Sequence, residues 1–556
     1  MTADSAASNR RSYTWIGLAT LLIAGLDVWA YLRPDIFSSD GTPSYFLKMP
    51  YFVQQGALLY GLLIVGLAGG IALVALGRAW VLRQELWILR LLSLGWCVFL
   101  GGYALVHFIN IDEMEALQTT WKILQGGRPY TDFFQHHHPL LWYQALPVLM
   151  VTGPSVKAFM ALRLVQYLYT LGILAATYLI TRQITRSPKT GYIAVLILGT
   201  TYFFASVGVE IRPDIAQTFF CVLSYYFLLR HLGSGRMADM AWGGLLMAVG
   251  FLFLQKALFF MLPLGLVMVY LWAKRRLTFG ALLVYAAAFG VPVVVFVLYY
   301  VLTGQGETYL IFAWVINFYK TAEGGLYREY VEGLIWNPCF WAGVLVMMPY
   351  MILNRKRIPE QVWLTYGIGM ILLLIAARNP RAWIQYYFPA FPMLAIPMAC
   401  MVRDILSGWR SHRRVILALC LAGICLPMFL LNFQYKRYNK VILRGLRESK
   451  GQHNTYVYDE LLIRNVFRKD LHYFWYSTHK GGMMEGYRHF AARPGYAWFD
   501  KAKYNDFDFC TLVETYRPAI VASRSDSPHQ LSRCDTIAGL YDRSPGDSLQ
   551  YVLRRE

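Results

Sequence analysis

The residues best suited to chemistry in this chain are concentrated in the stretch 110–143. It contains titratable groups of both signs: Asp112, Glu113, Asp132, His136, His137 and His138. Carboxylates and imidazoles act as general acids and bases, and imidazole also binds metals. Because hydrophobic runs flank this polar stretch, we expect a loop between membrane spans, and loops often carry chemistry.

A short amphipathic helix is predicted inside this loop. Met114, Leu117, Trp121 and Leu124 recur at helical spacing, and Gly126 follows them. We expect this helix to lie flat on the bilayer surface with its apolar side down. An alternative interpretation makes Asp112 the helix cap, with Glu115 reaching back to it, and this does not exclude catalysis by the same carboxylate.

Composition places the loop in a membrane protein. Of 556 residues, 57% are hydrophobic and 15% charged, and several apolar runs reach the roughly 18 residues that span a bilayer as a helix. We therefore predict an all-α polytopic membrane protein with about thirteen transmembrane helices. The expected spans lie near 13–33, 52–77, 84–106, 156–181, 190–207, 214–231, 239–254, 257–274, 277–302, 336–353, 361–377, 387–403 and 415–432.

Basic clusters predict the orientation of these spans. If the spans alternate, seven clusters of Arg and Lys fall on one side, which is cytoplasmic by the positive-inside rule. The first large outer loop, 107–155, then faces the opposite side, and we expect a bacterial inner membrane with the site facing the periplasm. The net charge of +20 suits membrane lipid head groups or phosphates. No basic stripe with interleaved aromatics indicates a nucleic-acid partner.

The composition changes after residue 432. We predict a transmembrane domain over 1–432 and a soluble periplasmic α/β domain over 433–556, with strands at 455–459, 519–523 and 549–553. Cys510 and Cys534 both lie in the second domain, where an oxidising compartment favours a disulfide between them.

Further charged residues interrupt the hydrophobic pattern near the outer face: Glu210, Arg212, Asp214, Lys256, Arg378 and Arg381. Charges at span ends are candidates for function, and cations beside a carboxylate suit a lipid-borne phosphate substrate. Alternatives remain open: Arg212 and Asp214 as a loop ion pair and helix start, and Lys256 as a side chain that extends from the end of its span to water. Aromatic residues of the 303–335 loop are predicted to form an interfacial belt or a lid.

These motifs resemble a known superfamily. Five parts of the sequence together resemble type C glycosyltransferases. They are the run from Asp112 to Pro139, Arg163, Arg212-Pro213-Asp214, the FLQKALFFMLP segment around Lys256, and RNPRAWIQYYFPAFPMLAIPMA from Arg378. The pattern is most similar to lipid A aminoarabinose transferases and protein O-mannosyltransferases, over roughly residues 107–405.

The resemblance implies a membrane glycosyltransferase with a polyprenyl-phosphate sugar donor, inverting transfer and an acceptor at the outer face. The acceptor is a glycan, a lipid or a protein. Asp112 would be the general base, with Glu113 and Asp214 as further catalytic candidates. The resemblance also implies contacts to the donor phosphate or sugar from several residues: Lys256, Arg378, Arg381, Arg212, His136, His137 and Tyr387.

The chain departs from the aminoarabinose transferases where that group has Glu-Lys-Pro-Pro and this chain has His136-His137-His138-Pro139. We expect no cofactor. A divalent metal ion on His136 and His138 is an alternative, because consecutive histidines do not share a helix face and at most two would bind one ion. A lipid or saccharide transporter, and an oligosaccharide polymerase or ligase, are the rival functions.

Overall fold

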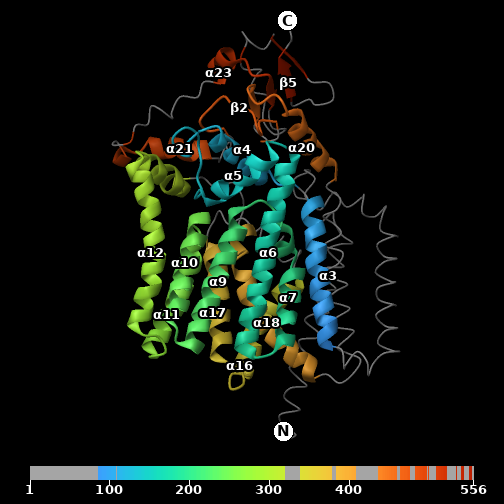
Figure 1. Ribbon diagram of the computed structural model, residues 1–556, viewed down its shortest axis with the longest axis vertical. Coiled ribbons are helices and arrows are strands. Elements are labelled where there is room, and N and C mark those ends of the chain that lie inside the picture. The colour runs from blue at the N-terminus through green and yellow to red at the C-terminus, as the bar shows by residue number, and fades with distance from the viewer. Residues whose placement is uncertain are drawn as a thin grey trace, which may run out of the picture.

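A bundle of long apolar helices, covered at one end by shorter elements and a small sheet, makes up the described part of the chain (Figure 1). The structure is a computed structural model. It describes residues 85–107, 109–319, 338–378, 384–408, 436–459, 462, 464–475, 483–496, 499, 509–522, 534, 540–543 and 550–553. The predicted spans near 13–33, 52–77 and 415–432 lie outside these residues, so the number of thirteen spans stays a prediction.

The helices of the bundle follow the predicted spans between residues 84 and 403. They are α3 Glu85–Val106, α6 Val156–Thr185, α7 Pro188–Thr200, α8 Tyr202–Val207, α9 Pro213–Ser234, α10 Met237–Phe253, α11 Ala257–Ala273, α12 Phe279–Leu302, α16 Pro338–Leu353, α17 Glu360–Arg378 and α18 Ala390–Gly408. The predicted span 190–207 is divided at Thr201, between α7 and α8. Local sequence sets helix ends: α9 begins at Pro213 and ends before Gly235, whose φ of 69° favours glycine.

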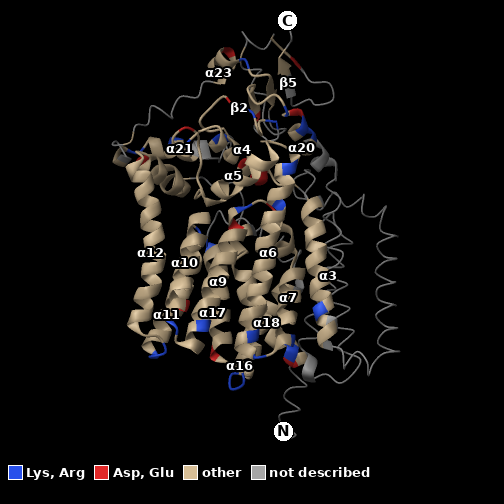
Figure 2. Ribbon diagram, in the orientation of Figure 1, with Lys and Arg blue, Asp and Glu red and all other residues tan. Residues whose placement is uncertain are grey.

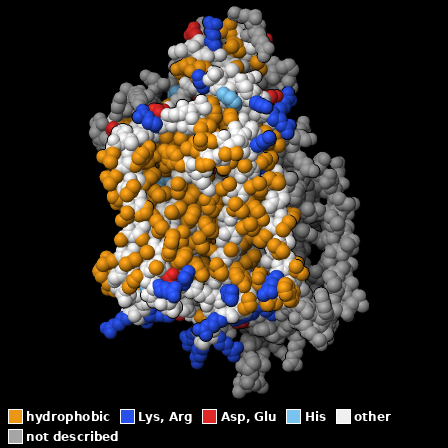
Figure 3. Space-filling view, in the orientation of Figure 1, with side chains coloured by type: hydrophobic (Ala, Val, Ile, Leu, Met, Phe, Trp, Pro, Cys, Tyr) orange, Lys and Arg blue, Asp and Glu red, His pale blue; other side chains and the backbone are white. Residues whose placement is uncertain are grey.

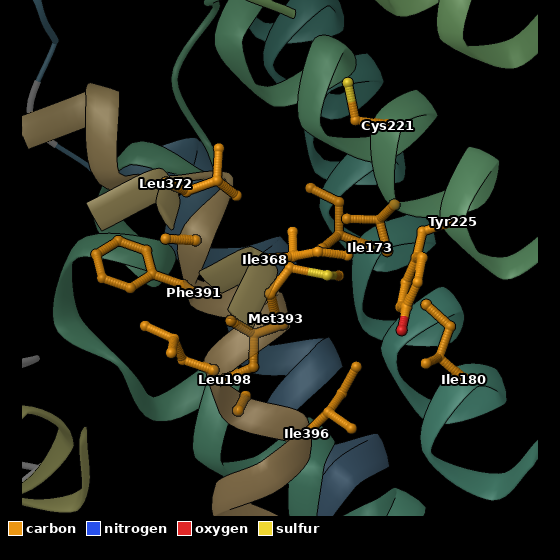
Figure 4. Close-up of a cluster of buried hydrophobic side chains, with 14 of the residues drawn as sticks. Ile173, Ile180, Leu198, Cys221, Tyr225, Ile368, Leu372, Phe391, Met393 and Ile396 are labelled. Carbon is orange, nitrogen blue, oxygen red and sulfur yellow. The ribbon is translucent and has the colours of Figure 1, made fainter. Parts of the chain in front are cut away.

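The core of the bundle is apolar and packed from several helices. Figure 4 shows side chains of α6, α7, α9, α17 and α18 meeting there, among them Ile173, Leu198, Ile368 and Met393. A buried hydroxyl pair crosses this core, where Tyr225 Oη lies 2.7 Å from Thr365 Oγ1. The pairing satisfies two polar groups that burial would otherwise leave without a partner.

The outside of the bundle is apolar as well. Hydrophobic side chains cover its visible face, and Lys and Arg gather below this belt (Figure 3). Among the described residues, three helices are long and apolar enough to cross a membrane: α6, α12 and α17. Basic residues mark the end of the bundle opposite the C-terminal part (Figure 2), as the positive-inside argument expects. These features indicate a polytopic membrane protein.

A layer of short helices lies between the bundle and the C-terminal part. It consists of α4 Ile111–Leu124, α5 Leu140–Thr152, α13 Gly306–Tyr309, the π-helix η3 Leu310–Val315 and α14 Ile316–Tyr319. The surface position predicted for the amphipathic helix is wrong. All residues of α4 from Glu113 to Trp121 are buried, because C-terminal residues cover the side turned away from the bundle.

The C-terminal part contains the predicted strands. Its elements are α20 Lys436–Glu448, β1 Tyr456–Asp459, β2 Lys469–Asp470, α21 Met483–Ala491, η6 Pro494–Tyr496, α23 Phe509–Tyr516, β3 Ile520–Ala522, β4 Tyr541–Arg543 and β5 Gln550–Leu553. The sheet order is β2-β1-β3-β5-β4, parallel across β2, β1 and β3 and antiparallel across β3, β5 and β4. The predicted disulfide between Cys510 and Cys534 is confirmed.

The hydrophobic cores do not divide at the predicted boundary of residue 432. The sheet and α23 have a core of their own, which includes Val513 and Val521. In contrast, residues of α20, α21 and the segment 462–475 share one cluster with α4, α5 and η3. Part of the C-terminal region is therefore built into the layer that holds the candidate site.

Candidate active site

The site begins at the first turn of α4, where the chain leaves α3. Asn110 is the N-cap: its side chain accepts a hydrogen bond from the backbone N–H of Asp112 at 3.2 Å. Glu113 completes a capping box by accepting from the Asn110 N–H at 2.9 Å. The alternative interpretation of Asp112 as cap and Glu115 as its partner is therefore wrong. The carboxylate of Asp112 is not needed to start the helix.

Glu113 is fully enclosed. Its carboxylate accepts two hydrogen bonds from Arg163 of α6, at 2.8 and 2.6 Å, and a further one from the Ile211 N–H at 2.9 Å. Arg163 also donates to the carbonyls of Ala104 and His107, both at 3.0 Å. The pair thus joins the end of α3, the start of α4, α6 and the turn before α9. This geometry favours a positioning role for Glu113 instead of the catalytic role expected from the sequence.

Asp112 lies in a second network of charged groups. Arg212 Nη1 contacts Asp112 Oδ2 at 2.8 Å, and its Nε donates to Glu210. Glu210 also lies 3.3 Å from Nε2 of His107. The side chain of Asp112 is 44% exposed, whereas those of Arg212 and Glu210 are 8% and 7% exposed. Arg212 is enclosed by carboxylates, and its expected contact with the donor stays a prediction.

Two buried members of this network, Glu210 and Arg212, stay charged at neutral pH. Burial favours the neutral form of Glu210, but Arg212 and His107 outweigh it and hold the pKa of Glu210 at about 2. Burial likewise opposes the charge of Arg212, yet Asp112, Glu210 and Asp214 raise the pKa of its guanidinium. Three carboxylates around one guanidinium give this cluster a net negative charge. A nearby cation is needed to balance it.

Lys256 supplies that cation. It follows α10 and caps α11, and its Nζ lies 3.5 Å from Oδ1 of Asp214 in the first turn of α9. The ammonium lies over the ring of Tyr386, 3.9 Å from its centroid. Burial lowers the pKa of Lys256, but Asp214 and Tyr386 outweigh this effect and raise it. Lys256 therefore remains a cation beside Asp214.

Tyr386 was missed in the sequence. Tyr387, the predicted contact, is buried in the bundle core, with its ring 6.5 Å from that of Trp341. Both tyrosines belong to η4 Ile384–Tyr387, where neighbouring side chains point in different directions. Tyr386 is therefore the tyrosine of η4 that contacts Lys256, and a donor contact of Tyr387 stays a prediction.

The three histidines occupy different environments. The ring of His136 is buried and stacks on Phe134 at 5.9 Å. His138 uses both ring nitrogens: Nδ1 lies 2.7 Å from the Phe251 carbonyl and Nε2 lies 2.9 Å from Tyr309 Oη. Burial lowers the pKa of His138 to about 4, so its imidazole is neutral.

These contacts bear on the proposed metal and phosphate roles. Because both nitrogens of His138 are engaged, it has no lone pair for a metal ion in this arrangement. Among the described residues, no group of three or more His, Cys, Asp or Glu has the geometry of a metal site. The ring of His137 is partly exposed, unlike those of His136 and His138, so it is the remaining histidine candidate for a contact to the donor.

Gln255, also missed in the sequence, connects the histidine loop to Lys256. Its Nε2 donates to the carbonyls of His136 at 2.8 Å and Ala313 at 3.0 Å, and its Oε1 accepts from the His138 N–H at 3.3 Å. A π-helix turn such as η3, which contains Ala313, often occurs at functional sites. The histidine loop therefore supports the backbone at Lys256.

Two further predicted residues lie at the end of α17 and beyond it. Arg378 exposes its side chain and makes no ion pair within the described part of the chain. Arg381 lies outside the described residues. Asp132, another acid of the first outer loop, pairs with Arg128 on an exposed turn, which separates it from the buried network.

Comparisons with known proteins match part of the sequence and the fold. The family model described as dolichyl-phosphate-mannose-protein mannosyltransferase matches residues 138–300, less than half of the chain. That range includes Arg163, Arg212, Asp214 and Lys256 but begins after Asp112. No curated protein sequence matches the chain significantly.

Solved structures with a similar fold include two of ArnT from Cupriavidus metallidurans. The apo form has 13% identity and a TM-score of 0.59, and the form bound to undecaprenyl phosphate has 12% identity and a TM-score of 0.58. Each match covers 84% of this chain and 97% of ArnT. An oligosaccharyltransferase of Archaeoglobus fulgidus in the apo form matches with 15% identity, 80% of this chain, 70% of that chain and a TM-score of 0.47. The resemblance predicted from the sequence is thus confirmed: the chain has the fold of ArnT and resembles type C glycosyltransferases.

Proposed function

We propose that this protein transfers a sugar from a polyprenyl-phosphate donor to an acceptor at the outer face of a bacterial inner membrane. One observation carries the proposal. Of the four carboxylates in the two networks around Arg163 and Arg212, Glu113, Glu210 and Asp214 are almost fully enclosed, whereas Asp112 is 44% exposed. Asp112 is the carboxylate that a substrate can reach.

Asp112 acts as the general base in this proposal. It takes the proton of the acceptor hydroxyl while that oxygen attacks the anomeric carbon, and the bond from that carbon to the phosphate oxygen breaks on the opposite face. The product is inverted at the anomeric carbon. A positioned base contributes about 10²–10⁴-fold to the rate. Arg212 holds the carboxylate in place at 2.8 Å, and Glu210 fixes Arg212 in turn.

Lys256 stabilises the departing lipid phosphate. Charge develops on the phosphate oxygen as the bond breaks, and a pre-positioned cation stabilises it without reorganisation. Asp214 and the ring of Tyr386 hold the ammonium. Arg378 is exposed beside this end of the bundle and supplies a second cation in the proposal, with Arg381 as a further candidate. ArnT, whose fold the chain shares, has been crystallised with undecaprenyl phosphate.

Sugar transfer in membranes tests the proposal. Purified wild type and Asp112→Asn are incubated with radiolabelled polyprenyl-phosphate sugars and a membrane extract as acceptor. We expect transfer by the wild type from one donor and a loss of about 10²–10⁴-fold in Asp112→Asn. The labelled product identifies the sugar and the acceptor class.

The stability of the variant must be measured alongside the transfer. Asp112→Asn is expected to unfold at nearly the wild-type temperature, because its side chain is partly exposed. Transfer by Asp112→Asn at the wild-type rate would remove Asp112 as the base. Absence of transfer from every donor in the wild type would contradict the glycosyltransferase proposal and favour transport.

A further inference from the structure

We propose that the C-terminal segment Asn465–Trp475 is a positioning part of the active site, with Asp470 holding α4 and thereby the base Asp112. This inference rests on the proposed function of Asp112. It concerns residues about 350 positions away in the sequence from the helix that they contact. The C-terminal region would then be required for the rate of transfer as well as for any contact with an acceptor.

The polar side of α4 is bonded to this segment. Gln118 Nε2 donates to the Arg468 carbonyl at 2.8 Å and to Asp470 Oδ2 at 2.9 Å, and Gln118 Oε1 accepts from the Phe467 N–H at 2.6 Å. One turn further along α4, Lys122 Nζ lies 2.6 Å from Asp470 Oδ2. The two side chains fix both the rotation and the height of the helix.

Asp470 is built into its position. Its side chain is 6% exposed, and Oδ1 accepts a further hydrogen bond from Asn465 Nδ2 at 2.8 Å. The ammonium of Lys122 lies 4.3 Å from the centroid of the Trp475 ring. Burial raises the pKa of Asp470 and lowers that of Lys122, so each group depends on the charge of the other. Removing one partner leaves an uncompensated buried charge.

The same segment also holds the loop that leads to the histidines. The Phe134 N–H donates to the Tyr473 carbonyl at 2.9 Å, Tyr473 Oη donates to the Tyr130 carbonyl at 2.7 Å, and Trp475 Nε1 donates to the Phe134 carbonyl at 3.0 Å. The loop and the helix are thus attached to the same segment of the C-terminal region.

The geometry of α4 connects these contacts to the base. Asp112 and Lys122 lie near opposite ends of one 14-residue helix, which moves as a unit because its backbone is hydrogen-bonded throughout. Loss of the attachment at Lys122 changes the tilt of α4 and therefore the position of Asp112. A displacement of about 1 Å in a reacting group can cost about 10²-fold in rate. Asp214 lies on α9 and Lys256 in the turn before α11, and among the described residues neither is bonded to the segment.

Single and double variants test the inference with two measurements. Lys122→Met, Asp470→Asn and the double variant are compared with the wild type in steady-state transfer and in hydrogen exchange of the α4 amides. For Lys122→Met we expect kcat to fall by about 10–100-fold, with KM for the lipid donor within about twofold because Lys256 is unaffected. Amides of residues 111–124 should exchange faster. The control is Arg444→Gln, which removes an exposed ion pair with Glu448 on α20 and should change neither measurement.

The double variant distinguishes positioning from a general loss of stability. Asn at position 470 removes the buried charge and still accepts from Gln118, so the double variant should recover several-fold in kcat relative to Lys122→Met. Unchanged exchange in α4, or a loss in the double variant equal to the product of the single losses, would overturn the inference. If the wild type transfers no sugar, the proposed function fails. Hydrogen exchange then still tests the attachment: faster exchange of the α4 amides in Lys122→Met shows that the segment holds the helix, and unchanged exchange shows that it does not.

Discussion

Asp112 and Glu113 are neighbours in the sequence and carry the same functional group, yet the fold gives them different environments. Glu113 accepts two hydrogen bonds from Arg163 and two from backbone N–H groups, and its side chain has no exposed surface. Asp112 has one ion pair among the described residues, with Arg212, and keeps 44% of its side chain exposed. The pair shows that an acid in a polar loop is a candidate base only where its lone pairs remain available.

Helix geometry produces this difference. Consecutive residues of an α-helix point about 100° apart, so Glu113 meets Arg163 of α6 while Asp112 meets Arg212 before α9. The same contrast separates the cations. Arg163 is fully engaged by Glu113 and two carbonyls, whereas Lys256 lies 3.5 Å from Asp214, a longer separation that leaves it donors for an anion.

The largest expected effect is on stability, on replacement of the enclosed acid Glu113. Glu113→Gln leaves the guanidinium of Arg163 buried without a countercharge, which should cost about 3–5 kcal/mol of stability. Thermal unfolding in detergent, followed by tryptophan fluorescence, measures the change. Asp112→Asn is the matched control and should alter stability by less than about 1 kcal/mol. Equal unfolding midpoints for the two variants would show that the charges of Glu113 and Asp112 contribute equally to stability.

Lys256→Met tests whether the cation at Lys256 is needed for sugar transfer. Methionine keeps an apolar stem over Tyr386 but removes the cation, so transfer should fall by about 10²–10³-fold, as on loss of one donor to a developing oxyanion. The unfolding midpoint should fall by less than in Glu113→Gln, because Asp214 keeps the nearby charge of Arg212 after its partner Lys256 is lost.

Lys157→Met, which removes an exposed lysine at the start of α6, is the control for this measurement and should leave transfer intact. A Lys256→Met variant that transfers sugar at the wild-type rate would reduce Lys256 to a structural partner of Asp214.

The sequence predicted the helices and the residue types of the site more fully than it predicted their roles. Apolar runs determine spans directly, since a bilayer imposes their length, and the loop with Asp112 and the cations near Lys256 followed from polar residues at span ends. Which of two adjacent residues faces the site depends on tertiary packing. The sequence therefore did not show that Glu113 is enclosed while Asp112 is exposed, or that Tyr386 contacts Lys256.

Burial of α4 was not predictable for a related reason. Its apolar spacing is typical of a helix on a membrane surface, and its polar residues gave no sign of being covered. Gln118 and Lys122 are bonded to residues of the C-terminal region, which contains none of the motifs recognised in the sequence. The partners are Arg468, Phe467 and Asp470. Likewise, His107 and Gln255 act through contacts that form only when distant helices meet.

Acidification should destabilise the protein through its enclosed histidines and not through the enclosed carboxylate of Glu210. With a pKa of about 2, Glu210 stays charged well below pH 5. His138 has its pKa lowered to about 4, so protons bind the unfolded chain preferentially as pH falls below about 6.5. Stability is therefore unaffected above that value and decreases between about pH 6.5 and 4, by about 2 kcal/mol at pH 5.

The pH dependence of the unfolding midpoint checks this expectation. His472, whose pKa is also lowered to about 4 by burial, contributes in the same direction. His138→Gln should therefore flatten the slope between pH 6.5 and 5 by about one proton without abolishing it. An unchanged slope would show that the His138 ring titrates normally in the folded protein.

The smallest effect is expected at Asp132, whose ion pair with Arg128 is exposed on both sides. Its carboxylate pairs with Arg128 at 3.2 Å, and the two side chains are 41% and 55% exposed. Water screens such a pair, so Asp132→Asn should change stability by about 0.5 kcal/mol or less. Transfer should stay at the wild-type rate, because Asp132 contacts none of the residues around Asp112. A substantial loss of transfer in Asp132→Asn would mean that an exposed acid in this loop is functional without contacts to Arg212 and Glu210. The surroundings of Asp112 would then no longer distinguish it as the base.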